Sequence, residues 1–492
     1  MILSVFAITV LHQSVRDLEV ATGKNPTAAN YRRLADAYVS AEDFQRASAA
    51  FFKASTLYAR LGDFNAAKVL QSQGQRYETK IDIFFEKAAT DPGYALAKFE
   101  PKAGCYIGAF IDREDALTRS FVGNGQTHRD PFDFDQAVGK KHAIYFTYLA
   151  YGRPFPQLWI SRLKSRAASA QIAWEPRSTT MVRDDQYLRN FAADCKASGV
   201  PIFLRFAGEM NGDWTPYNGD PIGYRKMFQT VAKVMHEDAP NVAMVWCPNE
   251  VPEGEITNYF PGDEAVDWVG INFYSVLFND GNRARGAEWR NPSDALKFVY
   301  NTYSPKHPIM IGEWAASHLS IVDAVQRPDF AINKIGQLYA ALPRLYPRVK
   351  AVNWLSMNTI EHAMPGRQLN DFSLMSDSTV FDKYKESISS DYYLNMVLPK
   401  ITSPIEFAPL TSSTTLSGKV KLSAVVKSYE QRPSVVWDVN ANPSSPKTDV
   451  GTYEATVDTK RLGTDEARIS VIVKDSKGRT AAVKEVTVKL KN

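Results

Sequence analysis

Eight apolar runs, each of five to nine residues, recur along the middle of this 492-residue chain and constrain its fold more than any other feature. They occupy residues 105–111, 142–150, 170–174, 201–207, 242–247, 267–274, 308–314 and 349–356. Most are nearly continuous apolar stretches rather than strict alternations, which is typical of parallel strands covered on both faces. Amphipathic stretches such as DQYLRNFAADCKASG (185–199) lie between most of them and indicate helices.

This alternation of strands and helices predicts an α/β fold, a (β/α)8 TIM barrel, over residues 96–399. A doubly wound open sheet is the alternative, but no G-x-G-x-x-G motif follows the first apolar run. The chain is too long for one core, so we expect further domains on either side of the barrel.

The residues before the barrel predict an all-α domain over residues 1–95, with helix throughout residues 13–90. The segments AYVSAEDFQRA and LYARLGDFNAA echo each other with an offset of 20 residues. They look like the helical hairpins of tetratricopeptide repeats, whose period of about 34 residues is longer. Such a domain predicts a surface for a protein partner; a helical cap on the neighbouring domain is the alternative.

The residues after the barrel predict an all-β domain over residues 400–492. Segments such as GTYEATVDT and ARISVIVKD alternate apolar with polar residues and are separated by turn-rich gaps, as in a β-sandwich. GTYEATVDT followed by ISVIVKDSKGRTAAV resembles the bacterial immunoglobulin-like modules appended to extracellular enzymes.

Charge and cysteine usage exclude several classes of function. The formal net charge is only +4 and no Lys/Arg run is present, so we expect no nucleic-acid partner. The three cysteines form no C-x-x-C pair and the seven histidines show no H-E-x-x-H spacing, so we expect neither a metal nor another cofactor.

The first residues bear on where the chain is found. Residues 1–12 are mostly apolar but too few to span a bilayer, so we expect no membrane span there. They are interpreted either as a signal or anchor segment or as a first packed helix. Together with the predicted C-terminal module, they favour an extracytoplasmic location, whether secreted, cell-surface or periplasmic.

Two carboxylates follow the fourth and seventh predicted strands, where a barrel of this kind carries its reactive groups. Glu209 lies in RFAGEMNGDW (205–214) and Glu313 in IGEWAAS (311–317). The other candidate site residues at the strand ends are Trp174, Glu175, Arg205, Asn211, Trp214, Trp246, Tyr274 and Trp354; Asn249, Asn272 and Trp314 also lie at strand ends, without an assigned role. A structural salt bridge is the alternative for Glu175, and barrel packing is the alternative for Trp174 and Trp246.

Paired carboxylates in an aromatic cleft suit the cleavage of glycosidic bonds. One carboxyl group donates a proton to the leaving oxygen while the other stabilises or attacks the anomeric carbon. In such pairs the proximity of like charges keeps one group protonated near neutral pH. Phosphoryl transfer would instead need cations and a metal.

The motifs FLRFAGEMNGDW, VAMVWCPNE, DWVGINFY and MIGEWAAS resemble glycoside hydrolase family 26, the β-mannanase-type enzymes. GCYIGAFID and IAWEP match in the same order, so the resemblance covers the whole predicted barrel. It implies a retaining double displacement on a β-linked polysaccharide, with an endo-β-1,4-mannanase-like activity. The roles that it implies are general acid/base for Glu209, nucleophile for Glu313, a hydrogen bond to the nucleophile from Tyr274, support of the floor for Arg205 and Asn211, and sugar platforms for Trp214 and Trp354.

One departure from this family limits the prediction of the substrate. The family usually has His before the acid/base Glu, whereas this chain has Gly208. Another β-linked polymer such as glucan, xylan or an exopolysaccharide is therefore an alternative. A carbohydrate-binding barrel without turnover and a scaffold whose outer domains bind partners are further alternatives.

Overall fold

The computed structural model describes residues 15–397, 402–430, 433–449 and 451–491, and the chain divides into two compact units. One unit contains residues 86–408 and the other combines residues 1–85 with residues 409–492. The larger unit is thus inserted into the smaller one along the sequence. The expected signal or anchor at residues 1–12 lies outside the described residues.

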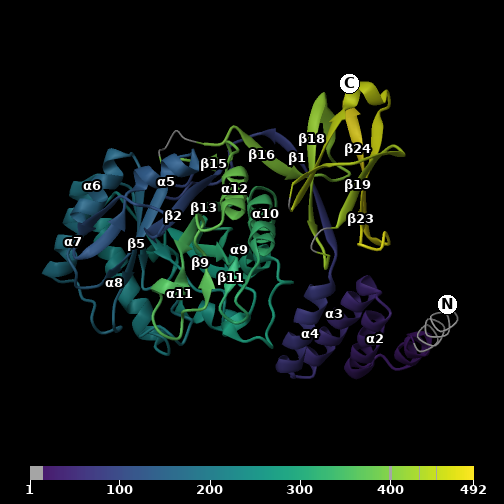
Figure 1. Ribbon diagram of the computed structural model, residues 1–492, viewed down its shortest axis with the longest axis horizontal. Coiled ribbons are helices and arrows are strands. Elements are labelled where there is room, and N and C mark those ends of the chain that lie inside the picture. The colour runs from purple at the N-terminus through teal and green to yellow at the C-terminus, as the bar shows by residue number, and fades with distance from the viewer. Residues whose placement is uncertain (1–14, 398–401, 431–432, 450, 492) are drawn as a thin grey trace. The chain divides into compact units, whose positions relative to one another are not determined.

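The predicted (β/α)8 barrel is confirmed within residues 86–408 (Figure 1). Its eight parallel strands pair in chain order, and the pairing of the last strand with the first closes the sheet. The strands are β2 (Cys105–Arg113), β5 (Ile144–Ala150), β6 (Ser169–Glu175), β7 (Ile202–Phe206), β8 (Val242–Trp246), β9 (Trp268–Ser275), β10 (Ile309–Ala316) and β13 (Val349–Met357). Each overlaps one of the eight apolar runs of the sequence.

Helices cover the outside of the barrel (Figure 1). The α-helices of this unit are α5 (Pro131–Val138), α6 (Gln157–Ser165), α7 (Gln186–Ser198), α8 (Pro221–Asp238), α9 (Lys297–Tyr303), α10 (Pro328–Leu345), α11 (Thr359–His362) and α12 (Ser378–Ser387). Asp185 and Asp220 cap α7 and α8 by accepting hydrogen bonds from backbone N–H groups of the first turn. The shorter elements are η1 (Glu253–Tyr259), η2 (Asp263–Ala265), η3 (Asn279–Gly281), η4 (Pro292–Leu296), β3 (Ser120–Gly123), β4 (Gln126–Arg129), β11 (Leu319–Ser320), β12 (Val325–Gln326), β14 (Asn370–Asp371) and β15 (Tyr393–Leu394).

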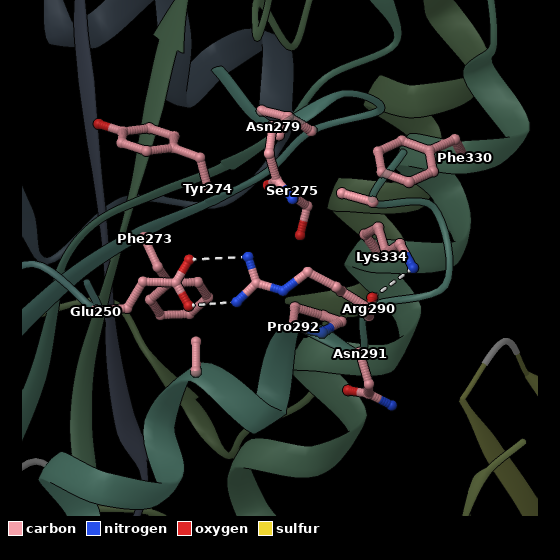
Figure 2. A pocket seen from close by; sticks show the side chains of 13 residues that line it. Glu250, Phe273, Tyr274, Ser275, Asn279, Arg290, Asn291, Pro292, Phe330 and Lys334 are labelled. Carbon is pink, nitrogen blue, oxygen red and sulfur yellow. Dashed lines mark hydrogen bonds and ion pairs between the residues drawn. The ribbon is translucent and has the colours of Figure 1, made fainter. Parts of the chain in front are cut away.

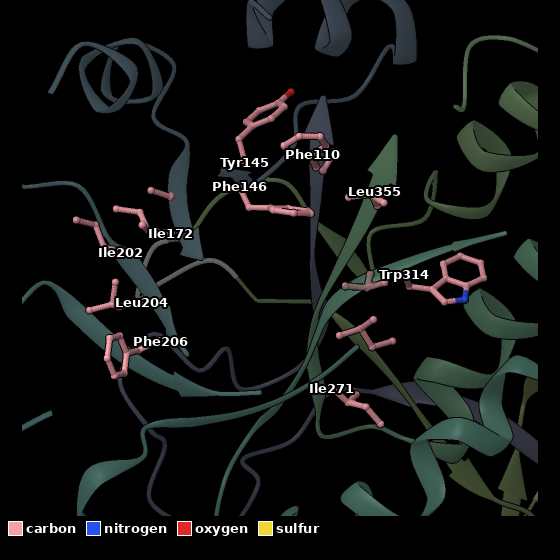
Figure 3. Close-up of a cluster of buried hydrophobic side chains, with 14 of the residues drawn as sticks. Phe110, Tyr145, Phe146, Ile172, Ile202, Leu204, Phe206, Ile271, Trp314 and Leu355 are labelled. Carbon is pink, nitrogen blue, oxygen red and sulfur yellow. The ribbon is translucent and has the colours of Figure 1, made fainter. Parts of the chain in front are cut away.

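The side chains of each strand divide between two buried layers because successive residues point to opposite faces. On β7, Ile202, Leu204 and Phe206 belong to the large cluster that packs under the helices, part of which Figure 3 shows. Phe203, between them, belongs to a separate cluster with inward-facing residues of the other strands. The same alternation places Arg205 on the inner face, one step closer to the carboxyl end of the barrel.

The helical part of the smaller unit comprises a helix over residues 15–24 and then α2 (Ala28–Ser40), α3 (Phe44–Arg60) and α4 (Phe64–Tyr77). The two echoing sequence segments correspond to the turns before α3 and α4. In each turn a residue with positive φ, Glu42 or Gly62, precedes an Asp whose side chain accepts a backbone N–H of the next helix. The repeat in the sequence is therefore a repeated helix stop and start.

The prediction of helix throughout residues 13–90 is wrong at its C-terminal end, because residues 80–88 form a strand, β1 (Lys80–Ala88). Its residues Ile81, Ile83 and Phe84 are buried, and β1 pairs antiparallel with β18 (Lys419–Lys427). A strand with buried Ile and Phe next to polar residues carries too short a pattern to be separated from a helix by periodicity alone.

The remainder of this unit is rich in strands, as expected for residues 400–492. Two five-stranded sheets have the orders β16-β1-β18-β22-β21 and β17-β24-β23-β19-β20, and one cluster of apolar side chains draws on both. The elements are β16 (Ile405–Pro409), β17 (Thr415–Ser417), β18 (Lys419–Lys427), β19 (Ser434–Val439), β20 (Asn442–Ser444), β21 (Lys447–Asp449), β22 (Thr452–Asp458), α13 (Thr459–Leu462), β23 (Glu466–Lys474) and β24 (Thr480–Lys491). Likeness to immunoglobulin modules and to tetratricopeptide repeats stays a prediction.

Across the described residues, none of the helices combines the length and the apolar character that a membrane crossing requires.

Candidate active site

Glu209 lies in a tight loop directly after β7, at the carboxyl end of the barrel. The backbones of Ala207 and Glu209 are both left-handed, with φ of 49° and 58°. Such conformations are costly for residues other than Gly and collect at functional sites. Hydrogen bonds hold them: Ala207 N donates to Trp174 O at 3.0 Å and Glu209 N donates to Cys247 O at 2.8 Å.

The Glu209 carboxylate is half-buried and accepts three hydrogen bonds from neutral donors. Asn249 Nδ2 and Asn272 Nδ2 donate to Oε1 at 3.1 and 2.9 Å. Trp214 Nε1 donates to Oε2 at 2.7 Å, and its side chain is 39% exposed. The carboxylate is therefore oriented by dipoles rather than by a full positive charge, and one of its oxygens lies beside an accessible aromatic ring.

Glu313 reaches the inside of the barrel because β10 is irregular at Gly312. On the outer face, Ile311 pairs with Ile271, and the register against β9 then shifts before Glu313 pairs with Asn272. A Cβ at position 312 would lie 2.7 Å from Asn272 Oδ1 and 2.8 Å from Cys247 Sγ, so only Gly fits there. The shift reverses the alternation and turns Glu313 inward while Trp314 packs outward.

Glu313 is only 5% exposed, and its carboxylate has a charged donor on one oxygen and phenol donors on both. Arg205 forms an ion pair with Oε1, and the Tyr148 hydroxyl donates to the same oxygen at 2.7 Å. The Tyr274 hydroxyl donates to Oε2 at 2.5 Å. This set of donors stabilises an ionised carboxylate at a buried position.

The electrostatics of these partners are mutual. Burial alone would lower the pKa of Arg205, but the Glu313 carboxylate together with Cys247, Tyr148 and Glu175 outweighs it and keeps that pKa well above its usual range. Burial raises the pKa values of Tyr148 and Tyr274 far above normal, and the charge of Glu313 adds to the effect. All three groups therefore stay protonated as donors to Glu313 throughout the neutral range.

Glu175, at the end of β6, is a third carboxyl group in the same neighbourhood. Its Oε2 and the backbone oxygen of Gly208 each lie 2.6 Å from the Tyr217 hydroxyl oxygen. Desolvation raises the pKa of Glu175 to about 7, against the opposing effect of Arg205. The structural salt bridge considered for Glu175 is absent from the ion pairs of the described residues, so Glu175 belongs to the site's polar network.

Three of the predicted site residues lie in the core instead. Trp174, Trp246 and Trp354 are fully buried. Trp174 stacks on Phe191 of α7, and Trp354 packs edge-on against Trp314 and donates Nε1–H to Phe372 O. The expectation that Trp354 serves as a sugar platform is therefore corrected, because its ring faces the helices and no face is open to a ligand.

Asn211 supports the site from behind. It is 1% exposed, and its amide donates to Asn249 O at 2.9 Å and accepts from Asn249 N at 2.9 Å. This pair of bonds fixes the backbone of Asn249, whose side chain holds Glu209. Asn211 therefore acts on the carboxylate through Asn249.

Two residues of the site, Tyr148 and Tyr217, were absent from the predicted strand-end residues. Asn249 and Asn272 were among those residues without an assigned role, and the structure places both on the Glu209 carboxylate. Tyr148 lies on the inner face of β5, so alternation along that strand would have identified it. Tyr217 lies in a loop without periodicity and carries no such signal.

A pocket lies beside Tyr274, between the end of β9 and the segments around η4 and α10 (Figure 2). Figure 2 shows Glu250 and Arg290 facing each other across it, and their ion pair has an N–O distance of 2.8 Å. Lys334 Nζ donates to the backbone oxygens of Glu288 and Arg290, each at 2.6 Å. The hydroxyl of Tyr274 points away from this charged pair, toward Glu313.

The arrangement thus offers one carboxylate held by a cation and two phenols, and a second one held by neutral donors beside an exposed indole. Among the residues that the structure describes, no group of His, Cys, Asp and Glu is placed to hold a metal ion. The carboxyl groups present can transfer protons and can form a bond from a carboxylate oxygen.

Comparison with known proteins relates the barrel to a family. Residues 179–289 match the model of Glycosyl hydrolase family 26, which confirms the resemblance over the segment that contains Glu209. Endoglucanase H of Acetivibrio thermocellus is 25% identical over 293 residues, which are 55% of this chain and 30% of that protein. A beta-1,3-xylanase from an Alcaligenes species is 28% identical over 114 residues, 22% of this chain and 23% of that protein.

The chain therefore spans less than a third of the length of these curated relatives. Among solved structures, a modular endo-beta-1,4-mannanase from Cellulomonas fimi aligns with 81% of this chain and 100% of its own, at 12% identity and a TM-score of 0.44.

Proposed function

We propose that the barrel is a retaining glycoside hydrolase that cleaves a β-linked polysaccharide, with Glu313 as nucleophile and Glu209 as general acid/base. The observation that carries this proposal is the unequal support of the two carboxylates. Glu313 is buried with an Arg cation and two phenol donors, whereas Glu209 is half-buried with neutral donors. The family match and the glycosidase relatives support the same reaction class.

The support of Glu313 suits a nucleophile. A nucleophile must be ionised in the resting enzyme, and Arg205 with Tyr148 and Tyr274 stabilises that form. In the first step a Glu313 oxygen forms a bond to the anomeric carbon while the bond from that carbon to the glycosidic oxygen breaks. Both phenols can then hydrogen-bond the ester oxygens of the intermediate.

The support of Glu209 suits a group that gains and loses a proton. Glu209 donates its proton to the departing glycosidic oxygen, and its carboxylate then removes a proton from water as that water attacks the anomeric carbon. The bond to Glu313 breaks in this second step. Asn249, Asn272 and Trp214 can orient either protonation state, because none of them carries a charge that would hold Glu209 ionised.

For the substrate, we propose a β-linked backbone, with endo-action on β-1,4-mannan as the first candidate from the family resemblance. The relatives named an endoglucanase and a beta-1,3-xylanase make β-glucan and β-1,3-xylan the next candidates. Trp214 offers an exposed aromatic face next to the acid/base and is proposed as the sugar platform at the site.

The test is a screen of soluble mannan, β-glucan, β-1,4- and β-1,3-xylan and bacterial exopolysaccharides with the full chain, alongside Glu209→Ala and Glu313→Ala. We expect hydrolysis of at least one polymer by the unaltered chain and its loss in both variants, with the first product released in the β configuration. Hydrolysis that survives either substitution would refute the two-carboxylate mechanism. Binding without hydrolysis would show a carbohydrate-binding barrel instead.

We also propose an extracytoplasmic location, since polymeric substrates are met outside the cell, and a protein partner for the helical segment of residues 15–77. Cell fractionation and affinity capture with the full chain as bait test these two proposals.

A further inference from the structure

Most of the hydrogen bonds that hold the backbone of the loop presenting Glu209 have an unambiguous donor. Ala207 N and Glu209 N donate to backbone oxygens, and the Tyr224 hydroxyl donates to Ala207 O at 3.0 Å. The remaining contact is that of Gly208 O with Tyr217. It differs because the same hydroxyl also contacts Glu175.

The Tyr217 hydroxyl lies 2.6 Å from two oxygens, yet it has one proton to donate. Gly208 O is a carbonyl and can only accept. If Glu175 were ionised, its oxygen too could only accept. One of the two contacts would then bring two oxygen atoms together with no proton between them. Both contacts are satisfied when Glu175 carries a proton that it donates to Tyr217, while Tyr217 donates its own proton to Gly208 O.

Position 208 lies next to this arrangement. A Cβ there would lie 3.6 Å from Glu175 Oε1, 3.7 Å from Arg205 Nε and 3.7 Å from Cys247 O, which are ordinary contact distances. The Glu175 carboxyl group therefore adjoins the position directly before the acid/base.

We propose that Glu175 is a positioning residue that carries a proton and, through Tyr217, fixes the Gly208 carbonyl and so the strained backbone that presents Glu209. The proposal rests on the proposed role of Glu209. The charged and titratable groups around Glu175 are Arg205 and Cys247 on the barrel wall, Glu209, Tyr217 and Tyr224 after β7, and Glu313 on β10. Burial and, less strongly, the two neighbouring carboxyl groups favour the proton on Glu175, whereas Arg205 and a hydrogen bond from Tyr217 to the carboxylate oppose it.

Glutamine at position 175 should preserve this chain of hydrogen bonds, because its amide N–H can donate to Tyr217 as the protonated acid does. Ionisation of Glu175 at alkaline pH should break the chain in the unaltered protein but cannot occur in Glu175→Gln. A pKa raised to about 7 in the folded state contributes stability that is complete below about pH 4.5 and is lost as the pH rises through 7. The same ionisation is expected to lower activity.

The experiment measures kcat and KM from pH 5 to 9 for Glu175→Gln, Glu175→Ala and Tyr217→Phe, on a polymer that the unaltered chain hydrolyses. We expect Glu175→Gln to retain kcat at pH 6 within about threefold and to extend activity to higher pH. Glu175→Ala and Tyr217→Phe should lower kcat about tenfold or more with little change in KM, because they displace the acid/base rather than the substrate. The control Tyr106→Phe removes a phenol that donates to Phe99 O at the opposite end of the barrel and should leave kcat unchanged.

The proposal is overturned if Glu175→Gln is as impaired as Glu175→Ala, which would show that the charge is required, or if Tyr217→Phe has unaltered kcat.

A second readout, the pH dependence of Tm, does not depend on hydrolysis. Between pH 6 and 8 the Tm of the unaltered chain should fall about 2 °C more than that of Glu175→Gln. Glu237→Gln, which removes an exposed carboxylate on α8, should leave that fall unchanged. Equal falls in Tm for the unaltered chain and Glu175→Gln would refute the proton on Glu175, even if no polymer is hydrolysed. If the expected difference in Tm is found but no polymer is hydrolysed, only the proposed function is refuted.

Discussion

The two ends of the candidate site support their carboxylates by opposite means. Glu313 stands on a barrel strand, is nearly enclosed, and is paired with a cation and two phenols. Glu209 stands on a strained loop, is half-buried, and is held by amides and an indole. Two chemically identical side chains in one fold can thus be suited to different chemical roles by the charge and the rigidity of their surroundings.

The largest expected effect distinguishes the two roles directly. Glu209→Ala should lower kcat by about 10²–10⁴ on a polysaccharide, because it removes general acid catalysis. Azide, an external nucleophile that needs no general base, should restore turnover of an activated aryl glycoside by Glu209→Ala and yield the β-glycosyl azide. Glu313→Ala should instead yield the α-glycosyl azide. The same anomer from both variants would contradict the assignment, and product NMR measures it.

The next effect concerns the cation on the Glu313 side. Arg205→Met should lower kcat less than Glu209→Ala does, and should lower the free energy of unfolding by about 3–5 kcal/mol because it leaves a buried carboxylate without its charged partner. The double variant Arg205→Met/Glu313→Gln should recover much of that stability, since it removes the unpaired charge as well. Urea unfolding measures both. An equally unstable double variant would show that Arg205 acts through packing rather than charge.

The phenols on Glu313 should matter less than the cation. Tyr274→Phe and Tyr148→Phe each remove one hydrogen bond to a charged group, worth about 1.5–3 kcal/mol. We expect each to lower kcat about tenfold or more, with the other phenol and Arg205 still in place. Tyr393→Phe, which removes a buried phenol donating to Tyr339 O, is the matched control and should retain activity. Full activity in Tyr274→Phe would contradict a role for that donor.

On the Glu209 side the two amides should differ. Asn272 donates to Glu209 and also accepts from Arg205 Nη1 at 3.3 Å, so it touches both halves of the site. Asn249 donates to the Glu209 carboxylate and so contacts only that half of the site. Asn272→Ala should therefore lower kcat/KM more than Asn249→Ala. Combining Asn272→Ala with Tyr274→Phe should give a non-additive loss, and simple additivity would show that the two halves are independent.

The smallest effect is expected at the exposed indole. Trp214→Phe keeps an aromatic face but loses the N–H bond to Glu209. We expect a reduction of kcat by a few-fold with KM little changed, whereas Trp214→Ala should also raise KM because the platform is lost. Equal KM values for the two variants would argue against sugar contact by this ring.

The barrel strands were predictable because each is an apolar run of the right length, and Glu209 and Glu313 follow from their places at strand ends. The errors share one physical cause, which is the direction of side chains. Trp174, Trp246 and Trp354 each lie two positions after an outward-facing residue of the same strand, so they too point to the helices. Those outward-facing residues are Ile172, Met244 and Val352, respectively. The same rule applied to β5 would have placed Tyr148 inside.

Two features lay beyond the reach of such a rule. The irregularity at Gly312 reverses the direction of the side chains on β10, and without it Glu313 would face the helices with Ile311. The contact of Tyr217 with Glu175 joins a loop to a strand about 40 residues earlier. Both depend on contacts between segments that are distant in the sequence, which local patterns do not encode.

The insertion of the barrel into the smaller unit bears on how the chain is made and dissected. Strand β1 precedes the barrel, whereas its partner β18 follows it. The strand β1 cannot pair with β18 until more than 300 further residues have been synthesised. During translation, the apolar residues of β1 therefore remain unburied until β18 has been made. A fragment cut at residue 95 or one begun at residue 400 would each hold part of a sheet whose other part is missing, so the two ends of this chain are best studied joined.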